Sequence, residues 1–313
     1  MLNRGDKVGV EREPVKLRGR KTVWQLLTGE KYIRWALVVP LLIVLAAFMF
    51  YPLFYCLYMS FQFYVLRKPS VFIGMENYRM VLHDMVFWLA LGRTFYVLVV
   101  SIAVELALGM GIALLLNREF KGQNTIRGVC LLPLLISPLA MSLMWNYMLH
   151  VQFGIVNQVM VWIGLDRVEW FASPKTAIYC IMLISIWQWT PFSIFVILAG
   201  LKGMPKDALE AANVDGASRW FIFRKLTLPS LMPLIIIVIL LRTMWLIRIF
   251  DPLYGTTRGG VGTELLDWMV YRIAFVFFDV GKAGALAIFS LYITIVLCAV
   301  LFRQLMKALG AAR

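Results

Sequence analysis

The sequence predicts an all-α integral membrane protein with six transmembrane helices and both termini in the cytoplasm. Three observations predict this class: an apolar composition, long segments without charge, and an uneven placement of Lys and Arg. Hydrophobic residues make up 61% of the 313 residues and charged residues only 15%. An average soluble domain has about 45–50% apolar and about 25% charged residues. The composition therefore excludes an ordinary soluble domain, and its high hydrophobicity excludes a disordered chain.

The predicted spans follow from segments that hold few or no charges. Four segments contain no Asp, Glu, Lys or Arg: 35–66, 128–165, 176–201 and 283–302. Two more are interrupted only by Glu105 or by Arg242 and Arg248. A helix needs about 20 residues to cross the hydrocarbon. The predicted spans are 35–58, 93–117, 126–148, 176–199, 229–250 and 283–303, and the aromatic segments 61–64 and 151–165 are expected at the membrane interface.

The basic residues predict the orientation. Of the 31 Lys and Arg, 20 fall in an N-terminal arm (1–34), the loops 118–127 and 200–229, and the C-terminal end from Arg303. Eight fall in the alternate segments, and Arg93, Arg242 and Arg248 lie in or beside spans. Cytoplasmic loops are enriched in Lys and Arg. We therefore expect a cytoplasmic arm (1–34), a membrane domain (35–303) and a cytoplasmic tail (304–313).

Several motifs of enzymes are missing from the sequence. No Gly-x-x-x-x-Gly-Lys-Ser/Thr loop occurs, so we expect no ATP site on this chain. His83 and His150 are the only histidines, and neither has a carboxylate at ligand spacing, so no metal or haem site is expected. No nucleophile elbow is present. The sequence therefore predicts no catalytic residue and no bound cofactor.

The cytoplasmic segment 200–229 is predicted to form two helices joined by a turn. Pro205 suits the start of a helix, 206–213 contains good helix formers, and Asp215-Gly216 favours a turn. An aromatic and basic stretch follows, up to Pro229. On composition alone, a loop that lies on anionic lipid is an equally good interpretation.

A motif in this segment resembles a known family. Glu210-Ala-Ala-x-x-Asp215-Gly216-Ala217, followed by Leu226-x-Leu228-Pro229, resembles the EAA motif of permease subunits of bacterial ATP-binding cassette (ABC) importers. Leu226 stands where the family usually has Ile. The resemblance implies the type I ABC importer permease fold, with this segment as the coupling helix that docks on a separate ATPase. The residues that it carries over are Glu210, Ala211, Ala212, Asp215, Gly216 and Ala217.

Further segments resemble the carbohydrate-uptake branch of these permeases, which includes those for maltose, glycerol-3-phosphate and trehalose. They are Phe72-x-Gly74-x-Glu76-Asn77-Tyr78, Phe87-Trp88-x-Ala90-Leu91, Gly154-x-Val156-Asn157 with Trp170, Trp187-x-Trp189-x-Pro191-Phe192, and Arg248-x-Phe250-Asp251-x-x-Tyr254 with Thr257-x-Gly259-Gly260 and Thr263-Glu264. Val261 replaces the proline that often follows the two glycines. The resemblance covers about residues 35–303.

The resemblance implies a set of partners and a location. These are a second permease subunit, in a heterodimer, an ABC ATPase dimer that holds ATP and Mg, a periplasmic or lipid-anchored solute-binding protein, a sugar substrate and membrane lipid, with no nucleic acid. The chain itself would be no enzyme and would lie in a bacterial inner (plasma) membrane. A secondary transporter or channel is the alternative, and it would need intramembrane acidic residues and usually more spans.

Polar residues at membrane depth are candidates for the substrate path, because an unpaired polar group in hydrocarbon is costly. Gln188 lies near the middle of the fourth span, beside Trp187, Trp189 and Thr190. An amide and aromatic faces suit the hydroxyl groups and C–H faces of a sugar. Other candidates are Ser137, Asn146, Trp245 and Arg248. Packing between helices is the alternative for these residues, and for Arg248 it is an ion pair with Asp251.

Arg242 is the most costly residue within a predicted span. We expect it to face a polar cavity or a carboxylate, and Glu105 is a candidate partner that the sequence cannot assign. If Arg242 faces the path, an anionic sugar derivative becomes a plausible substrate.

Overall fold

The computed structural model describes residues 30–311, so most of the predicted arm (residues 1–29) and residues 312–313 lie outside the described residues. The chain divides into two compact units, residues 1–55 and 56–313, which we describe separately. Its elements are α2 (Glu30–Ser60), β1 (Gln62–Phe63), β2 (Val71–Phe72), α3 (Glu76–His83), α4 (Met85–Leu116), α5 (Gln123–Leu135), α6 (Pro138–Met148), α7 (Ile155–Trp162), α8 (Pro174–Gly203), α9 (Lys206–Val214), α10 (Arg219–Ile222), the π-helix η1 (Phe223–Thr227), α11 (Leu228–Leu246), α12 (Asp251–Tyr254), α13 (Leu266–Tyr271), the π-helix η2 (Arg272–Val276) and α14 (Val280–Ala311).

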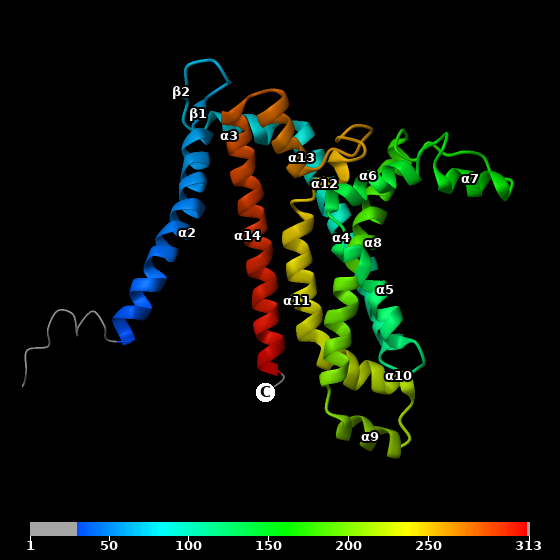
Figure 1. The fold of residues 1–313 in the computed structure, drawn as a ribbon. Coiled ribbons are helices and arrows are strands. Elements are labelled where there is room, and N and C mark those ends of the chain that lie inside the picture. The colour runs from blue at the N-terminus through cyan, green and yellow to red at the C-terminus, as the bar shows by residue number, and fades with distance from the viewer. Residues whose placement is uncertain (1–29, 312–313) are drawn as a thin grey trace, which may run out of the picture. The chain divides into compact units, whose positions relative to one another are not determined.

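The fold is helical, as predicted (Figure 1). In the described part of the chain the only sheet is the antiparallel pair β1–β2, in which Gln62 faces Phe72. Within residues 30–311, five helices are long and apolar enough to cross a membrane: Val38–Ser60, Met85–Leu116, Pro174–Gly203, Arg219–Leu246 and Val280–Gly310. The bent pair α5 and α6 raises this count to six if it makes one crossing. The side of the membrane on which each terminus lies stays a prediction.

The third predicted span, 126–148, is wrong as a single straight helix. Helices α5 and α6 are bent by 98° at a break between them. Ile136 and Ser137 have extended backbones, and Pro138 begins α6. A residue before proline is disfavoured in the helical region, because the proline ring clashes with its backbone. The Ser137-Pro138 step therefore ends one helix and starts another in a new direction.

The fifth predicted span, 229–250, also has different bounds. Helical structure begins at Arg219, passes through the π-helix η1 and ends at Leu246. Pro229 is the second residue of α11 and directly follows the π-helix η1, where the hydrogen-bond register of the helix changes. The residues that follow Leu246 turn away into the short helix α12.

Helix α2 belongs partly to the first unit and is described by itself. The predicted span 35–58 lies within this helix, whose part Val38–Ser60 is long and apolar enough to cross a membrane, and the helix continues through Pro40 and Pro52. Its large apolar side chains are exposed, as in Phe48, which is 80% exposed. An apolar helix with this exposure is suited to lipid or to another apolar surface.

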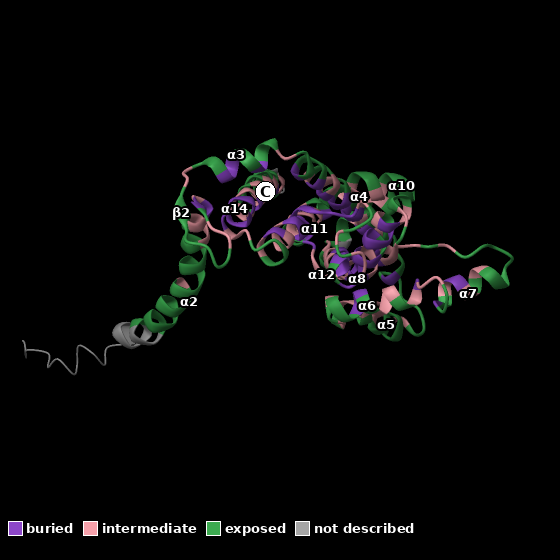
Figure 2. Ribbon diagram, turned by 90° about the horizontal axis from the view of Figure 1, so that it is seen from above, coloured by how far each residue is buried: buried purple, intermediate pink, exposed green. Residues whose placement is uncertain are grey.

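The second unit is organised around the pair α4 and α8. A buried cluster joins them to α11 and α13, and it includes Val97, Ile181, Leu246 and Trp268. The two long helices approach closely at Gly109, where an added Cβ would lie 2.7 Å from the Cβ of Ser193. Small residues let membrane helices pack at short distance. Figure 2 shows that the buried residues concentrate on these central helices.

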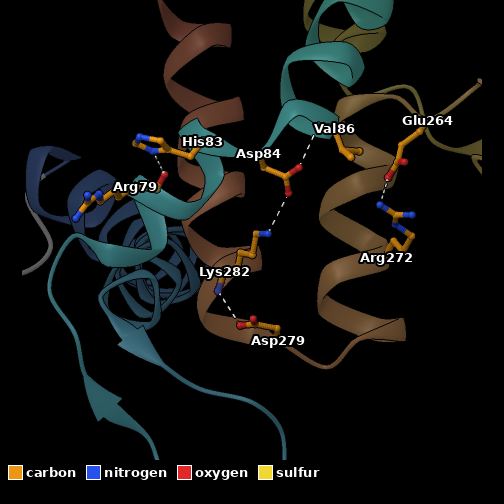
Figure 3. Close-up of polar contacts among 8 residues, drawn as sticks. All are labelled: Arg79, His83, Asp84, Val86, Glu264, Arg272, Asp279 and Lys282. Carbon is orange, nitrogen blue, oxygen red and sulfur yellow. Dashed lines mark hydrogen bonds and ion pairs between the residues drawn. The ribbon is translucent and has the colours of Figure 1, made fainter.

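Polar contacts fix the end of the second unit that lies opposite α9 (Figure 1). Asn77 of α3 is fully buried and donates to the carbonyl oxygens of Ser60 (2.9 Å) and Gln62 (2.8 Å). Lys282 of α14 pairs with Asp84 at 3.1 Å, as Figure 3 shows. These contacts tie α3 and the start of α4 to the start of α14.

Candidate functional site

The segment 200–229 forms the helix, turn and helix that the sequence predicts. Helix α9 begins after Pro205, which is its N-cap, and it ends at Val214. Ser218 then starts α10, since its hydroxyl oxygen accepts a hydrogen bond from the N–H of Phe221 at 3.2 Å. Helices α9 and α10 lie at one end of the second unit, beyond α11 (Figure 1).

The end of α9 explains the glycine of the motif. Gly216 has a left-handed backbone, with φ at +76°. Its N–H donates to the carbonyl of Asn213 at 3.1 Å, and the N–H of Ala217 donates to the carbonyl of Ala212 at 3.0 Å. These two bonds make a Schellman motif, in which a left-handed residue closes the helix. Glycine adopts this conformation without steric cost, so the motif positions Ala212, Gly216 and Ala217 encode a helix end.

Four of the six residues of the EAA motif are exposed to the surroundings. Glu210, Ala211, Asp215 and Gly216 are exposed, and Ala212 and Ala217 are half-buried. Val214, which lies between motif residues, is 87% exposed. A short helix that shows a carboxylate and an apolar side chain to the outside has a surface suited to contact with another protein.

Several substrate-path candidates meet at one small cavity between two candidate membrane helices, α8 and α11. The cavity has a volume of about 50 Å³ and lies between the middle of α8 and the end of α11. Its polar and aromatic lining comes from Ser185, Gln188, Trp189, Arg242, Trp245, Arg248, Phe250 and Asp251. Five of the predicted candidates are therefore brought together. Ser185 was missed by the sequence analysis, although it lies one helical turn before Gln188.

Arg242 is paired with Glu105, as one of the two expectations for it stated. The guanidinium Nε donates to Oε2 of Glu105 at 2.7 Å, and Nη2 donates to Oε1 at 2.7 Å. Nη2 also donates to the hydroxyl of Ser185 at 3.1 Å. Both charged side chains are 1% exposed. The two-point pairing is a strong geometry for arginine and carboxylate, and here it connects α4, α8 and α11.

Two tryptophans lie beside this ion pair in the cavity lining, Trp189 against Arg242 and Trp245 against Trp189. The Cζ atom of Arg242 lies 4.7 Å from the ring centre of Trp189. The rings of Trp189 and Trp245 are 5.1 Å apart, and Trp245 is 59% exposed. Gln188 donates from Nε2 to the carbonyl of Ile136 at 3.1 Å, so its amide oxygen remains available. Ile136 lies at the bend between α5 and α6, where the helix is interrupted, so its carbonyl is free to accept this bond from a side chain.

The remaining candidates do not line the cavity. Trp187 packs against Trp145 with ring centres 5.8 Å apart, on another face of α8. The hydroxyl of Thr190 donates to the carbonyl of Ile186 at 2.6 Å, within the same helix. Asn146 donates to the carbonyl of Gly255 at 3.1 Å, which ties α6 to the segment after α12. Ser137 is exposed at the start of α6. For Trp187, Thr190 and Asn146, the packing alternative fits these contacts.

The alternative that the sequence offered for Arg248, an ion pair with Asp251, is not formed in the described structure. Helix α11 ends at Leu246, so the two residues are not one turn apart on a helix, and no salt bridge joins them in the part of the chain that is described. Their charges instead act on Asp267. Burial raises the pKa of the Asp267 carboxyl, while the positive charge of Arg248 lowers it and the negative charge of Asp251 raises it further.

No metal centre is visible within residues 30–311, which contain no group of three or more His, Cys, Asp or Glu side chains at metal-binding distances. Within these residues the two candidate functional features are the exposed helix α9 and the cavity between α8 and α11.

The sequence matches, over residues 105–309, the family described as binding-protein-dependent transport system inner membrane component. It is 32% identical over 258 residues to the trehalose/maltose transport system permease protein MalF of Thermococcus litoralis, covering 82% of this chain and 86% of that one. It is 33% identical over 288 residues to the sulfoquinovosyl glycerol transport system permease protein SmoG of Agrobacterium fabrum, covering 91% and 93%. The trehalose transport system permease protein SugA of Mycobacterium tuberculosis is 32% identical over 262 residues, covering 83% and 84%.

Solved structures show the same fold. A chain of a bacterial ABC transporter involved in the import of the acidic polysaccharide alginate superposes with a TM-score of 0.80 at 22% identity, covering 91% of this chain and 98% of that one. A chain of the MetNI methionine ABC transporter, in an inward-facing conformation, has a TM-score of 0.53 at 18% identity, covering 72% and 98%.

Proposed function

The chain belongs to the family of binding-protein-dependent transport system inner membrane components, and from this premise we propose that it forms half of the translocation path of an ATP-driven sugar importer. It is a permease of the sugar ABC transporter type, a multi-pass membrane component and not an enzyme. In the proposal a second, different permease subunit completes the path, a separate ATPase dimer binds ATP and Mg, and a solute-binding protein delivers the sugar. The bacterial plasma membrane is its proposed location.

Helix α9 is the observation that carries the coupling part of this proposal. The Schellman end at Gly216 holds the motif as a short, separate helix with an exposed surface. The sequence contains no phosphate-binding loop of its own, so the energy of ATP must reach this chain through a contact with another subunit. A rigid helix at the membrane surface is suited to transmit movement of a bound ATPase to the spans.

The cavity supports a shared translocation path. Its volume of about 50 Å³ holds a water molecule or two, whereas sites for small ligands usually have about 300–1,000 Å³. Trp245, which is 59% exposed, extends this lining to the surface of the chain. We therefore propose that the chain supplies one wall of a sugar site, with Gln188, Trp189 and Trp245 facing the sugar, and that the second permease supplies the other wall.

The alternative of a secondary transporter has less support. A proton-coupled transporter needs an intramembrane acidic group that can exchange protons. Glu105 is the acidic residue within the described spans, and Arg242 occupies both of its oxygens. A carboxylate bound in this way is not free to serve as a relay.

The coupling proposal is tested with the complex of the chain, its second permease and its ATPase, reconstituted in lipid. Gly216→Asp or Glu210→Lys should leave the chain inserted and assembled but abolish the ATPase response to sugar-loaded binding protein. Gly122→Asp is the matched control, since Gly122 also has a left-handed backbone, with φ at +85°, and also has no atom within 4 Å of an added Cβ. An ATPase that still responds in the Gly216 and Glu210 variants would show that α9 does not couple.

A further inference from the structure

The strongest unexplained feature of the cavity is a buried arginine whose charge is already neutralised. Arg242 has two bonds to Glu105 and one to Ser185, and these use Nε and Nη2. A guanidinium has five N–H groups, of which Nη1 carries two. Within the described residues Nη1 makes no hydrogen bond, and Arg242 lines the cavity. The arginine therefore offers hydrogen-bond donors to the cavity while its charge is balanced from behind.

The other charges of the lining also balance. Arg248 and Asp251 carry opposite charges and both line the cavity. With the pair Arg242 and Glu105, the site has no net charge. An anion that enters the cavity must compete with Glu105 for Arg242. Both side chains are 1% exposed, so water would not solvate Glu105 if it lost its partner, and the exchange is costly.

The neutral groups of the lining suit a hydroxylated ring. Trp189 and Trp245 present two aromatic faces 5.1 Å apart, and Gln188 offers an amide oxygen as acceptor. Aromatic faces pack on the C–H faces of sugars, while N–H donors and amide oxygens bind hydroxyl groups.

We propose that Glu105 is a specificity-determining residue, which balances the charge of Arg242 so that the arginine acts as a hydrogen-bond donor within a neutral ion pair, and which thereby selects uncharged sugars over anionic ones. This inference rests on the proposed function and names the substrate class of the same site. It replaces the expectation that Arg242 itself selects an anionic sugar derivative. Glu105 does not touch the sugar in this proposal; it acts through Arg242.

The experiment measures binding to the purified permease–ATPase complex without binding protein, so that only the membrane site selects. The probes are maltose and maltobionate, a related sugar acid with one negative charge, and the measurement is titration calorimetry. In the wild-type complex maltose should bind more tightly than maltobionate. Glu105→Gln removes the negative charge and leaves the charge of Arg242 uncompensated. The dissociation constant of maltobionate divided by that of maltose should therefore fall by on the order of tenfold or more.

Three variants separate charge from shape. Glu105→Asp keeps the charge and should keep the preference for maltose. The double variant Glu105→Gln/Arg242→Gln has no charge at the pair and should also restore the preference for maltose. Glu119→Gln removes an exposed carboxylate from the loop between α4 and α5 and should change nothing. Size-exclusion chromatography establishes that each complex is assembled.

The outcomes distinguish this inference from the proposed function. An unchanged ratio in Glu105→Gln would overturn the role of Glu105. If neither maltose nor maltobionate binds any complex, while the ATPase still responds to loaded binding protein, the selection of uncharged sugars at this site is overturned and the importer function stands. An ATPase that does not respond to the wild-type chain would overturn the proposed function itself.

Discussion

Gly255 lies directly against Ser142, so that an added Cβ at position 255 would overlap the Ser142 hydroxyl. Ser142 belongs to α6 and is fully buried, and Gly255 follows α12. The carbonyl of Gly255 also accepts the hydrogen bond from Asn146. This close contact connects the second half of the bent pair to the segment that carries Asp251 into the cavity.

Gly255→Ala should therefore destabilise the chain, since the new methyl group must displace Ser142 or the backbone of Leu143. Overpacking of this kind costs about 1–3 kcal/mol. Thermal unfolding of the purified complex in detergent measures the effect. Gly111→Ala is the control, because Gly111 lies in α4 with no atom within 4 Å of an added Cβ. Equal stability of the two variants would mean that Ser142 can move away from the new methyl group without a measurable cost in stability.

Asn77 is expected to be a strong stabilising residue at the end opposite α9. Asn77→Leu removes donors from the carbonyls of Ser60 and Gln62 and leaves them without this partner in a buried place. An unsatisfied buried group costs about 1–3 kcal/mol. Thermal unfolding should show a lower midpoint than for Asn124→Leu, a change at an exposed position of α5. A midpoint equal to that of the control would show that water reaches the two carbonyls.

The sequence was sufficient to predict the features that depend on local composition. Charge-free length gave the apolar helices, because the cost of a charge in hydrocarbon acts on each segment separately. The turn at Asp215-Gly216 was predictable for the same reason, since the left-handed backbone at Gly216 is a local demand.

Features that depend on three-dimensional neighbours were not predictable. Arg242 and Glu105 are 137 residues apart in the sequence. A charged side chain within a span needs a polar partner, and from the sequence that partner could be either a carboxylate or a polar cavity. The bend at Ser137-Pro138 was missed, because apolar length alone cannot tell a straight span from a broken one. The ion pair with Asp251, which was the alternative for Arg248, requires a helix that continues past Leu246, and α11 ends at that residue.

The pairing of Arg242 and Glu105 predicts a non-additive pattern of stabilities. Arg242→Met or Glu105→Leu alone leaves a buried charge without its partner, which costs about 3–5 kcal/mol. The double variant Glu105→Leu/Arg242→Met removes both charges and should recover most of this loss, because apolar replacement of a whole buried pair is often neutral. Thermal unfolding of all four chains in one detergent measures the coupling. Additive losses in the double variant would show that the two residues act separately.

Glu264 should make stability depend on pH. Its carboxyl lies 2.6 Å from Nη2 of Arg272 (Figure 3), yet Oε1 makes no well-aligned hydrogen bond. Burial raises the pKa of the Glu264 carboxyl above 4.5, against the positive charges of Arg272 and Arg93, which lower it. A carboxyl whose pKa is higher in the folded state stabilises the fold most when it is protonated. Its contribution is therefore complete below about pH 4.5 and is lost as the pH rises through the raised pKa.

Glu264→Gln should remove this dependence, because the neutral amide occupies the same place without titrating. Unfolding midpoints measured between about pH 4 and 8 should then fall less steeply with rising pH than in the wild-type chain. Glu76→Gln is the control, since Glu76 is an exposed carboxylate 3.9 Å from Arg79 and also lies outside the spans. If the midpoint of Glu264→Gln varies with pH in the same way as those of the wild-type chain and of Glu76→Gln, the ion pair with Arg272 offsets the cost of burying the charge.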